Sequence, residues 1–180
     1  GVPDGKIDSH DRTIIGNPTP RYEFGLTLGL QWKGIDFSAF FQGVGKKDVY
    51  YSGAGARALC GNYTIYKYQF DYWTPENPDA KFPRLLEDPN ATNPNNMISS
   101  FWVKSGAYCR LKNIVLGYTL PSSITKAAHI SKLRVYASAQ NLFTIKDNFY
   151  EGFDPENSVS SGASLYPLNK TFVFGLNVEF

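Results

Sequence analysis

The sequence is poor in charged residues and in the residues that build most catalytic and metal sites. Of its 180 residues 19% are charged, the net charge is +2, and there are two cysteines and two histidines. So small a net charge gives no reason to expect a nucleic-acid partner. Two cysteines do not make a disulfide framework, and no Cys/His spacing indicates zinc. No apolar run approaches the roughly 18 residues of a membrane-spanning helix.

Catalytic motifs are missing as well. His10 and His129 lie in unrelated loop segments, with neither a metal-ligand pattern nor a nucleophile nearby, which favours surface or capping roles. There is no Gly-x-Ser-x-Gly motif and no phosphate-binding loop. The sequence therefore predicts no enzyme and no cofactor, with one weak exception.

That exception is calcium. Asp4-Gly5-Lys6-Ile7-Asp8, with Asp11 three residues on, resembles the second half of a calcium loop. The earlier ligand positions fall at Val2 and before the chain begins, so a surface Asp-Gly turn is the competing interpretation. Cys60 and Cys109 can pair in an oxidising compartment or remain buried thiols, and the sequence leaves both open.

Strand-forming and turn-forming residues are abundant instead. Aromatic residues make up 16% of the chain, and there are 16 glycines and 11 prolines. This composition is typical of strands joined by elaborate loops. No signal peptide opens the chain, and Gly1-Val2-Pro3-Asp4-Gly5 resembles a cut inside a loop, so we expect a fragment or a processed product.

Residues 171–180 show the clearest pattern. Successive side chains of a strand point to opposite faces, so one face is wholly apolar; it carries Phe172, Phe174, Leu176, Val178 and Phe180. The alternation continues to a terminal Phe, where a soluble domain usually has a frayed polar tail. This pattern fits a membrane β-barrel strand, and the last strand of a soluble sandwich is the alternative.

Four further strands are predicted. Residues 21–32 and 35–42 alternate in the same way around a Lys33-Gly34 turn, which predicts a β-hairpin. Residues 107–120 form a third strand, whose alternation is unclear near Arg110-Leu111-Lys112-Asn113 and suggests a bulge. Residues 132–144 form a fourth, and short helical pieces are expected near 63–72 and 122–130.

The connections between these strands alternate in length. Those at 33–34 and 121–131 are short, and those at about 43–106 and 145–166 are long. In an up-and-down meander all the short connections lie at one end, as in outer-membrane barrels with short periplasmic turns and long extracellular loops. The carboxyl terminus then lies at the periplasmic end, with Trp32, Tyr118 and Phe180 near that interface. The pattern favours a barrel over a soluble sandwich, and five strands are too few to close one.

Several short motifs, in this order, resemble the C-terminal segment of SusC/RagA-like, TonB-dependent outer-membrane transporters of the Bacteroidetes. They cover nearly the whole chain and include Ile15-Gly16-Asn17-Pro18-Thr19-Pro20, Trp32-Lys33-Gly34-Ile35-Asp36-Phe37-Ser38, Tyr72-Trp73-Thr74-Pro75-Glu76-Asn77-Pro78, Leu116-Gly117-Tyr118-Thr119-Leu120-Pro121 and Gln140-Asn141-Leu142-Phe143-Thr144, together with the terminal strand.

The resemblance implies an all-β, antiparallel meander over residues 1–180 that forms the last five or so strands of a 22-stranded barrel, with the N-terminal plug and earlier strands absent. It implies uptake of glycans or peptides across the outer membrane, driven by TonB-ExbB-ExbD through the missing part. The implied partners are a SusD-like surface lipoprotein and the barrel-assembly machinery, which reads the terminal Phe180.

The long loop 43–106 is the predicted functional surface. Aromatic side chains present flat apolar faces with a polar tip, which suits sugar rings and protein partners; the candidates are Tyr50, Tyr51, Tyr63, Tyr66, Tyr68, Tyr72 and Trp73. The alternative is that they pack the loop on itself. Polar residues of the opposite strand face are expected in the lumen, namely Glu23, Gln31, Asp36, Gln42, Arg134, Gln140 and Asn177.

Two other functions remain open. A soluble carbohydrate-binding module would fold alone in water and bury both Phe172/Phe174 and Phe24/Leu26 in one core. An enzyme would need a carboxylate pair that converges on a pocket, which a sequence does not reveal.

Overall fold

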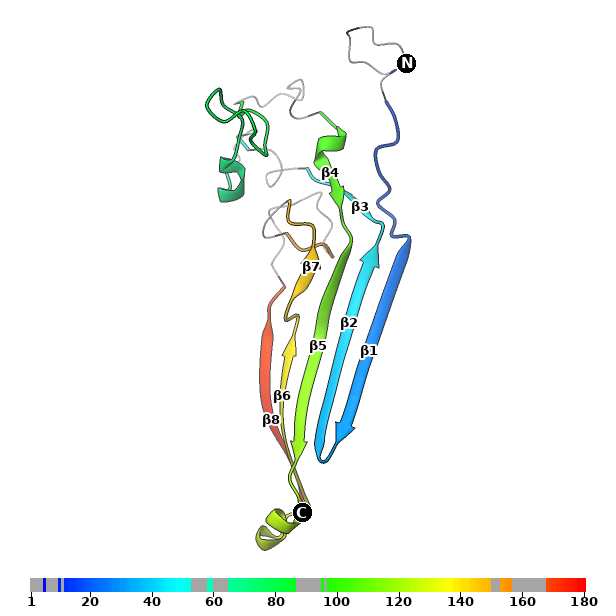
Figure 1. Cartoon of the computed structure of the whole chain (residues 1–180), viewed down its shortest axis with the longest axis vertical. Coiled ribbons are helices and arrows are strands. Elements are labelled where there is room, and N and C mark those ends of the chain that lie inside the picture. The colour runs from blue at the N-terminus through cyan, green and yellow to red at the C-terminus, as the bar shows by residue number, and fades with distance from the viewer. Residues whose placement is uncertain are drawn as a thin grey trace.

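The computed structural model describes Gly5, His10 and residues 12–52, 58–59, 65–86, 95, 97–149, 153–156 and 168–180. Within these ranges the chain is a long antiparallel sheet, with irregular loops gathered at one end (Figure 1). The strand order is β1-β2-β5-β6-β8, with β7 paired to β5 beyond the end of β6. The main strands are β1 (Tyr22–Trp32), β2 (Ile35–Gly45), β5 (Tyr108–Thr119), β6 (Lys132–Gln140), β7 (Thr144–Lys146) and β8 (Thr171–Glu179).

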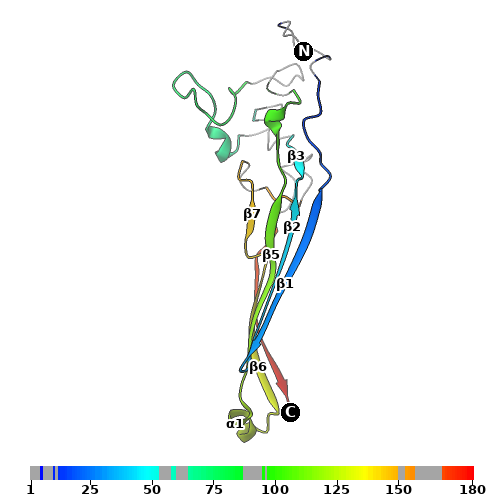
Figure 2. The same cartoon turned by 45° about the vertical axis from the view of Figure 1, so that its right-hand side comes forward.

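Neighbours along this path are also neighbours in chain order, apart from the small elements inside the connections. The predicted antiparallel meander is therefore confirmed. Figure 2, turned by 45°, shows the described strands of this sheet as a narrow single layer, against which no second described sheet packs. Among the described residues β1 and β8 stand at the two edges, so this part of the chain does not form a closed barrel.

The two ends of the sheet differ as the connection lengths predict. At the end that we call the turn end lie the β1–β2 turn, the short helices α1 (Ser122–Thr125) and η5 (Lys126–Ala128), and the carboxyl terminus (Figure 1). In the tight turn Lys33 and Gly34 have φ of 46° and 84°, the left-handed geometry that matches the twist of a two-residue hairpin. The opposite, loop end carries the long connections and the amino-terminal segment.

Cross-strand register extends the apolar face over the whole sheet. Leu30 pairs with Phe37, which pairs with Leu116, and the same row continues through Ala137 to Phe174. Alternate residues of a strand share a face, so the next row on this face lies two residues away along each strand. The two such rows that flank this one are also apolar. This face is exposed in the structure, and Phe174 is 81% accessible.

The opposite face is mostly polar and holds the predicted polar set. Asp36 and Arg134 face each other across Gly117 and form a two-pronged ion pair, with Arg134 Nε donating to Asp36 Oδ1 at 2.8 Å. A Cβ at Gly117 would lie 2.4 Å from Arg134 Nη2 and 2.5 Å from Asp36 Oδ1. The glycine therefore provides the space that the ion pair occupies.

The predicted bulge in the third strand is confirmed at Lys112. Phe40 pairs with Asn113 while Phe41 pairs with Leu111, so Lys112 is an extra residue in β5. An extra residue reverses the face of every side chain beyond it. Arg110 consequently pairs with Gln42 on the polar face, where an unbroken strand would have turned it toward the apolar face.

Other parts of the fourth strand and the loops depart from prediction. The predicted strand 132–144 is interrupted after Gln140 by Asn141, whose φ is 53°. Strands β3 (Asp48–Tyr50) and β4 (Val103–Ser105) form a small two-stranded sheet inside the long loop 43–106, which is predicted to be irregular. The expected helical pieces appear as η2 (Lys67–Phe70), α1 and η5, and η4 (Ser100–Trp102) was not foreseen.

Candidate functional site

A cluster of aromatic side chains joins the two long loops at the loop end. Phe82 and Trp102 form its buried centre, each only 4% exposed. Residues of the first loop, 43–106, meet residues of the second, 145–166: the ring centroids of Phe82 and Phe149 are 5.4 Å apart, and those of Tyr68 and Phe153 are 6.2 Å apart. The other members are Tyr50, Tyr51, Tyr72 and Phe101.

Backbone hydrogen bonds hold this aromatic cluster in place. The Tyr51 N–H donates to the Trp102 carbonyl at 2.9 Å, which links the β3 side of the loop to η4. Trp73 N–H donates to the Phe82 carbonyl, and Phe82 N–H to the Asp71 carbonyl, both at 2.9 Å. The indole Nε1 of Trp102 donates to the Asn95 carbonyl at 3.0 Å, so its polar atom is satisfied in a buried position.

Two lysines contact the cluster through its aromatic rings. The Nζ of Lys104 lies 3.9 Å from the ring centroid of Phe149 and 5.0 Å from that of Phe101. Lys81 Nζ lies 4.6 Å from the same Phe149 centroid and donates a hydrogen bond to the Phe149 carbonyl. These cation–π contacts add to the link between the two loops.

The structure places most of the predicted aromatic residues in or beside this cluster. Tyr50, Tyr51, Tyr68 and Tyr72 pack against its centre, and Tyr66 stacks on Tyr68 at 5.7 Å. Burial raises the pKa of the Tyr51 and Tyr68 hydroxyls, with a smaller contribution from Asp147 for Tyr51 and from Tyr66 for Tyr68. Both hydroxyls therefore stay neutral at physiological pH.

Trp73 differs from these residues because it is 38% exposed. Tyr63 lies outside the described residues. The clustered tyrosines thus pack the loop on itself, which is the alternative to contact with a ligand or partner. Contact with a ligand or partner stays a prediction for the whole set.

Below the aromatic cluster a buried arginine binds the second loop to the sheet. Arg110 is 2% exposed; its Nη2 lies 2.6 Å from Asp154 Oδ2, and its Nη1 lies 3.2 Å from Glu156 Oε1. Its Nε donates to Thr144 Oγ1 at 2.7 Å, and Lys112 Nζ lies 2.7 Å from Glu156 Oε1. We call this group the Arg110 anchor.

The Arg110 anchor was not predicted from the sequence. A signal was present in the uncertain alternation at residues 110–113, because a bulge there brings Arg110 onto the polar face. Asp154 lies 44 residues beyond Arg110, and Glu156 lies 44 residues beyond Lys112. Spacing alone does not connect residues so distant in a loop.

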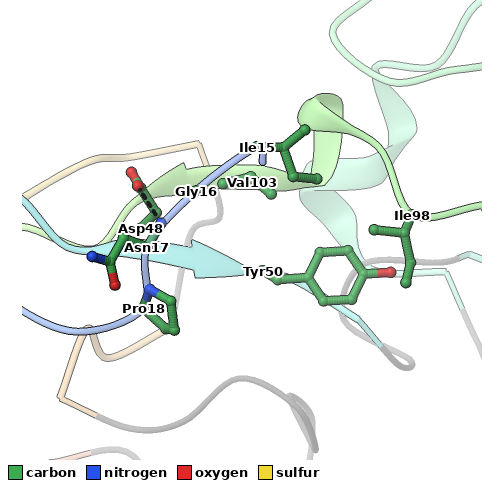
Figure 3. Close-up of a pocket in the computed structure, with 8 residues that line it drawn as sticks. All are labelled: Ile15, Gly16, Asn17, Pro18, Asp48, Tyr50, Ile98 and Val103. Carbon is green, nitrogen blue, oxygen red and sulfur yellow. Dashed lines mark hydrogen bonds between the residues drawn. The ribbon is translucent and has the colours of Figure 1, made fainter. Parts of the chain in front are cut away.

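A hollow lies where the amino-terminal segment crosses β3 and β4 (Figure 3). It has a volume of about 200 Å³ and is lined on its apolar side by Ile15, Tyr50, Ile98 and Val103. Asp48 holds the segment there: the Asn17 N–H donates to Asp48 Oδ2 at 2.8 Å, and the Asp48 N–H to the Asn17 carbonyl at 2.9 Å. The Ile15-Gly16-Asn17-Pro18 motif therefore binds to β3 through Asn17 and Asp48. The Tyr50 ring and the neighbouring aliphatic side chains border the hollow beside it.

The remaining site predictions are untested. Asp4, Asp8 and Asp11 lie outside the described residues, as does Cys60. Cys109 forms no disulfide within the part of the chain that the structure describes, and its pairing with Cys60 stays a prediction. Among the described residues no helix is both long enough and apolar enough to cross a membrane.

Comparison with known proteins connects this architecture to one class of receptor. No family model matches the chain. TonB-dependent receptor P3 of Formosa agariphila is 34% identical over 98% of this chain and 18% of the relative. TonB-dependent receptor SusC of Bacteroides thetaiotaomicron is 29% identical over 98% of this chain and 17% of the relative. The chain thus spans less than a fifth of the length of these relatives.

Solved structures agree. The RagAB peptide transporter superposes with a TM-score of 0.70 at 29% identity, over 93% of this chain and 18% of that one. The same importer in its closed-closed state gives a TM-score of 0.70 at 26% identity, over 98% of this chain. The predicted resemblance to the SusC/RagA type is confirmed, and the described sheet matches part of the RagA barrel. The comparisons also confirm that the relatives are receptors and transporters, not enzymes.

Proposed function

Because the chain is homologous along 98% of its length to TonB-dependent receptors such as SusC, we propose that it is the C-terminal part of an outer-membrane nutrient importer. The complete protein takes up oligosaccharides or peptides with energy relayed by TonB-ExbB-ExbD. In this proposal residues 1–180 supply the last strands of the barrel. The plug and the earlier strands belong to the rest of the protein.

One observation carries the proposal beyond similarity: one face of the sheet is apolar, and no other described part of the chain covers it. Phe172 and Phe174 are 61% and 81% exposed, and Phe24 and Leu26 are 46% and 51% exposed. A membrane barrel presents such a face to lipid and its polar face to the lumen. The Asp36–Arg134 ion pair then lies on the lumen side.

The same observation counts against a soluble carbohydrate-binding module. That alternative requires Phe172/Phe174 and Phe24/Leu26 to be buried in one core. The described structure does not meet this requirement, because all four side chains are exposed. Aromatic residues at the loop end remain suited to a sugar or a peptide, but as part of a transporter.

At the loop end we propose two ligand-contacting or partner-contacting residues from the predicted set. Tyr50 lines the open hollow of Figure 3, and Trp73 presents an exposed indole. Their flat apolar faces suit a sugar ring or an apolar peptide side chain. A SusD-like lipoprotein is the proposed extracellular partner, and Phe180 the proposed signal for the barrel-assembly machinery.

The test uses the full-length gene product in its native cell. We expect a heat-modifiable outer-membrane protein whose deletion abolishes uptake of a labelled oligosaccharide or peptide pool, and whose uptake stops when TonB is removed. A product found only in the soluble fraction, or uptake that persists without TonB, would refute the proposal.

Point variants then examine the loop residues. Tyr50→Ala and Trp73→Ala are each expected to raise the half-saturating substrate concentration about fivefold, because an aromatic contact contributes on the order of 1 kcal/mol. Phe70→Ala is the matched control, since Phe70 is an exposed aromatic residue of the same loop outside the predicted set. An equal effect of all three variants would remove the specific role of Tyr50 and Trp73.

A further inference from the structure

The apolar face of the sheet is hollowed over β6. The hollow has a volume of about 470 Å³, and its lining is almost entirely apolar. It spans the neighbouring strands β2, β5, β6 and β8. The side chains that line it on this face are Ile35, Leu116, Tyr118, Val135, Ala137 and Phe174.

Its shape follows from the residue sizes in successive cross-strand rows. Ala137 stands between Leu116 of β5 and Phe174 of β8, and Ala139 stands between Ile114 and Phe172. Two small side chains are thus flanked on both sides by large ones that project from the face. Of β6 the hollow is lined by Val135 and Ala137 on this face. Alternate residues of a strand are about 6.7 Å apart, so the trough runs for about 7 Å along β6.

No missing strand of a barrel can cover this trough. The two central strands under it already have both neighbours, because β5 pairs with β2 and β6, and β6 pairs with β5 and β8; only β8, which contributes Phe174, has a free edge. Further strands can join only at the free edges of β1 and β8, in the plane of the sheet. What fills the trough must therefore approach the face from outside.

We propose that this trough is a binding site for an acyl chain of a membrane phospholipid. The inference rests on the proposed function, since an outer-membrane location makes the apolar face the lipid-facing one. The trough is continuous with that face, and it lies toward the turn end, where Tyr118 shares a cross-strand row with Ile35 and Trp32. A flexible hydrocarbon chain fills a narrow apolar trough without leaving a polar group unpaired.

The experiment uses the full-length transporter reconstituted in phosphatidylethanolamine vesicles that contain a small fraction of phosphatidylethanolamine with a diazirine in its acyl chain. After illumination, mass spectrometry maps the labelled peptides. We expect the β6 and β8 peptides to be labelled several-fold more than the β1 peptide around Leu28, which is exposed on the same face. Uniform labelling along the apolar face would overturn the proposal.

Filling the trough supplies the second arm. Ala137→Phe and the milder Ala137→Leu are expected to lower β6 and β8 labelling to the β1 level. Leu28→Phe, which adds bulk to the same face outside the trough, is expected to change nothing there. Unchanged β6 and β8 labelling in an assembled Ala137 variant would contradict the site. If neither variant assembles, the wild-type labelling decides: stronger labelling of β6 and β8 than of β1 supports the site, and uniform labelling refutes it.

Uptake and outer-membrane insertion are measured on the same strains, because they separate the two levels of the argument. A wild-type protein that inserts and imports, yet labels uniformly, refutes the lipid site and leaves the importer standing. A protein absent from the outer membrane refutes both.

Discussion

The sheet and the loop end treat large apolar side chains in opposite ways. In the sheet Phe174 and Leu30 are 81% and 61% exposed, whereas Phe82 and Trp102 at the loop end are each buried to 4% exposure. Charged side chains differ in burial in the same way. Arg110 is buried at the loop end, whereas Asp36 and Arg134 lie partly exposed on the polar face of the sheet. The loop end is packed like the core of a water-soluble protein, whereas the exposed apolar face of the sheet fits the hydrocarbon surroundings of the proposed function.

This difference separates what stabilises each region. The sheet depends on continuous backbone pairing, because no other part of the chain that the structure describes packs over its apolar face. The loop end has few paired strands and depends on side-chain packing and ion pairs. Changes inside one region should therefore leave the other intact, and the following predictions examine that independence.

Removing the centre of the aromatic cluster should have the largest effect. Trp102→Ala is expected to destabilise the loop end by about 3–5 kcal/mol, because a buried indole leaves a cavity. Hydrogen exchange of the full-length protein should show lost protection in residues 65–86 and 97–103 and unchanged protection in β1 and β2. Trp73→Ala, at an exposed tryptophan of the same loop, is the control with little expected change. Loss of protection throughout the sheet would mean that the two regions fold as one unit.

A charge on the apolar face should have the next largest effect, on the sheet alone. Ile114→Arg is expected to cost about 2–4 kcal/mol in a bilayer, the penalty for a lipid-facing arginine near mid-membrane, because Ile114 lies two apolar rows away from Tyr118 at the interface. Val115→Arg places the same side chain one residue away, on the polar face, and should cost much less. Urea unfolding in lipid vesicles measures both. Equal costs would show that the two faces do not have different surroundings.

The sequence was sufficient to predict the sheet because alternation is a local signal. Five strand positions, the tight turn at Lys33-Gly34 and the bulge near Lys112 could all be read from neighbouring residues. Register then followed from keeping apolar residues such as Leu30, Leu116 and Phe174 on one face. The interruption at Asn141 was missed, because a single residue with positive φ leaves the alternation on either side undisturbed.

The loop end could be predicted only as a set of residue types. Aromatic residues were expected there, but the contact of Tyr68 with Phe153 joins residues far apart in the chain. No periodicity connects such residues, since their distance depends on how two irregular loops fold together. The Arg110 anchor was missed for the same reason, although the bulge that orients Arg110 was foreseen.

The Arg110 anchor offers a sharper comparison of buried and exposed ion pairs. Arg110→Gln is expected to destabilise the second loop by about 1.5–3 kcal/mol, because it removes charge-assisted hydrogen bonds from partly buried Asp154 and Glu156. Faster proteolytic cleavage between residues 147 and 168 would report the loss. Lys132→Gln breaks an exposed pair with Glu179 of 3.7 Å and should cost less than about 1 kcal/mol. If both variants behave alike, burial of Arg110 contributes nothing to holding the loop.

Glycine substitutions give the smallest expected effect and examine the polar face of the sheet. Gly117→Ala would place a methyl group within 2.5 Å of both Asp36 and Arg134, so the ion pair must separate or shift, at a cost of about 1–3 kcal/mol. A Cβ at Gly29 meets nothing within 4 Å, so Gly29→Ala should be neutral or stabilising by about 0.5–1 kcal/mol. Urea unfolding in lipid vesicles again measures both. A neutral Gly117→Ala would mean that Asp36 and Arg134 part easily, and that the register of β2, β5 and β6 rests on backbone pairing and the apolar face without help from this ion pair.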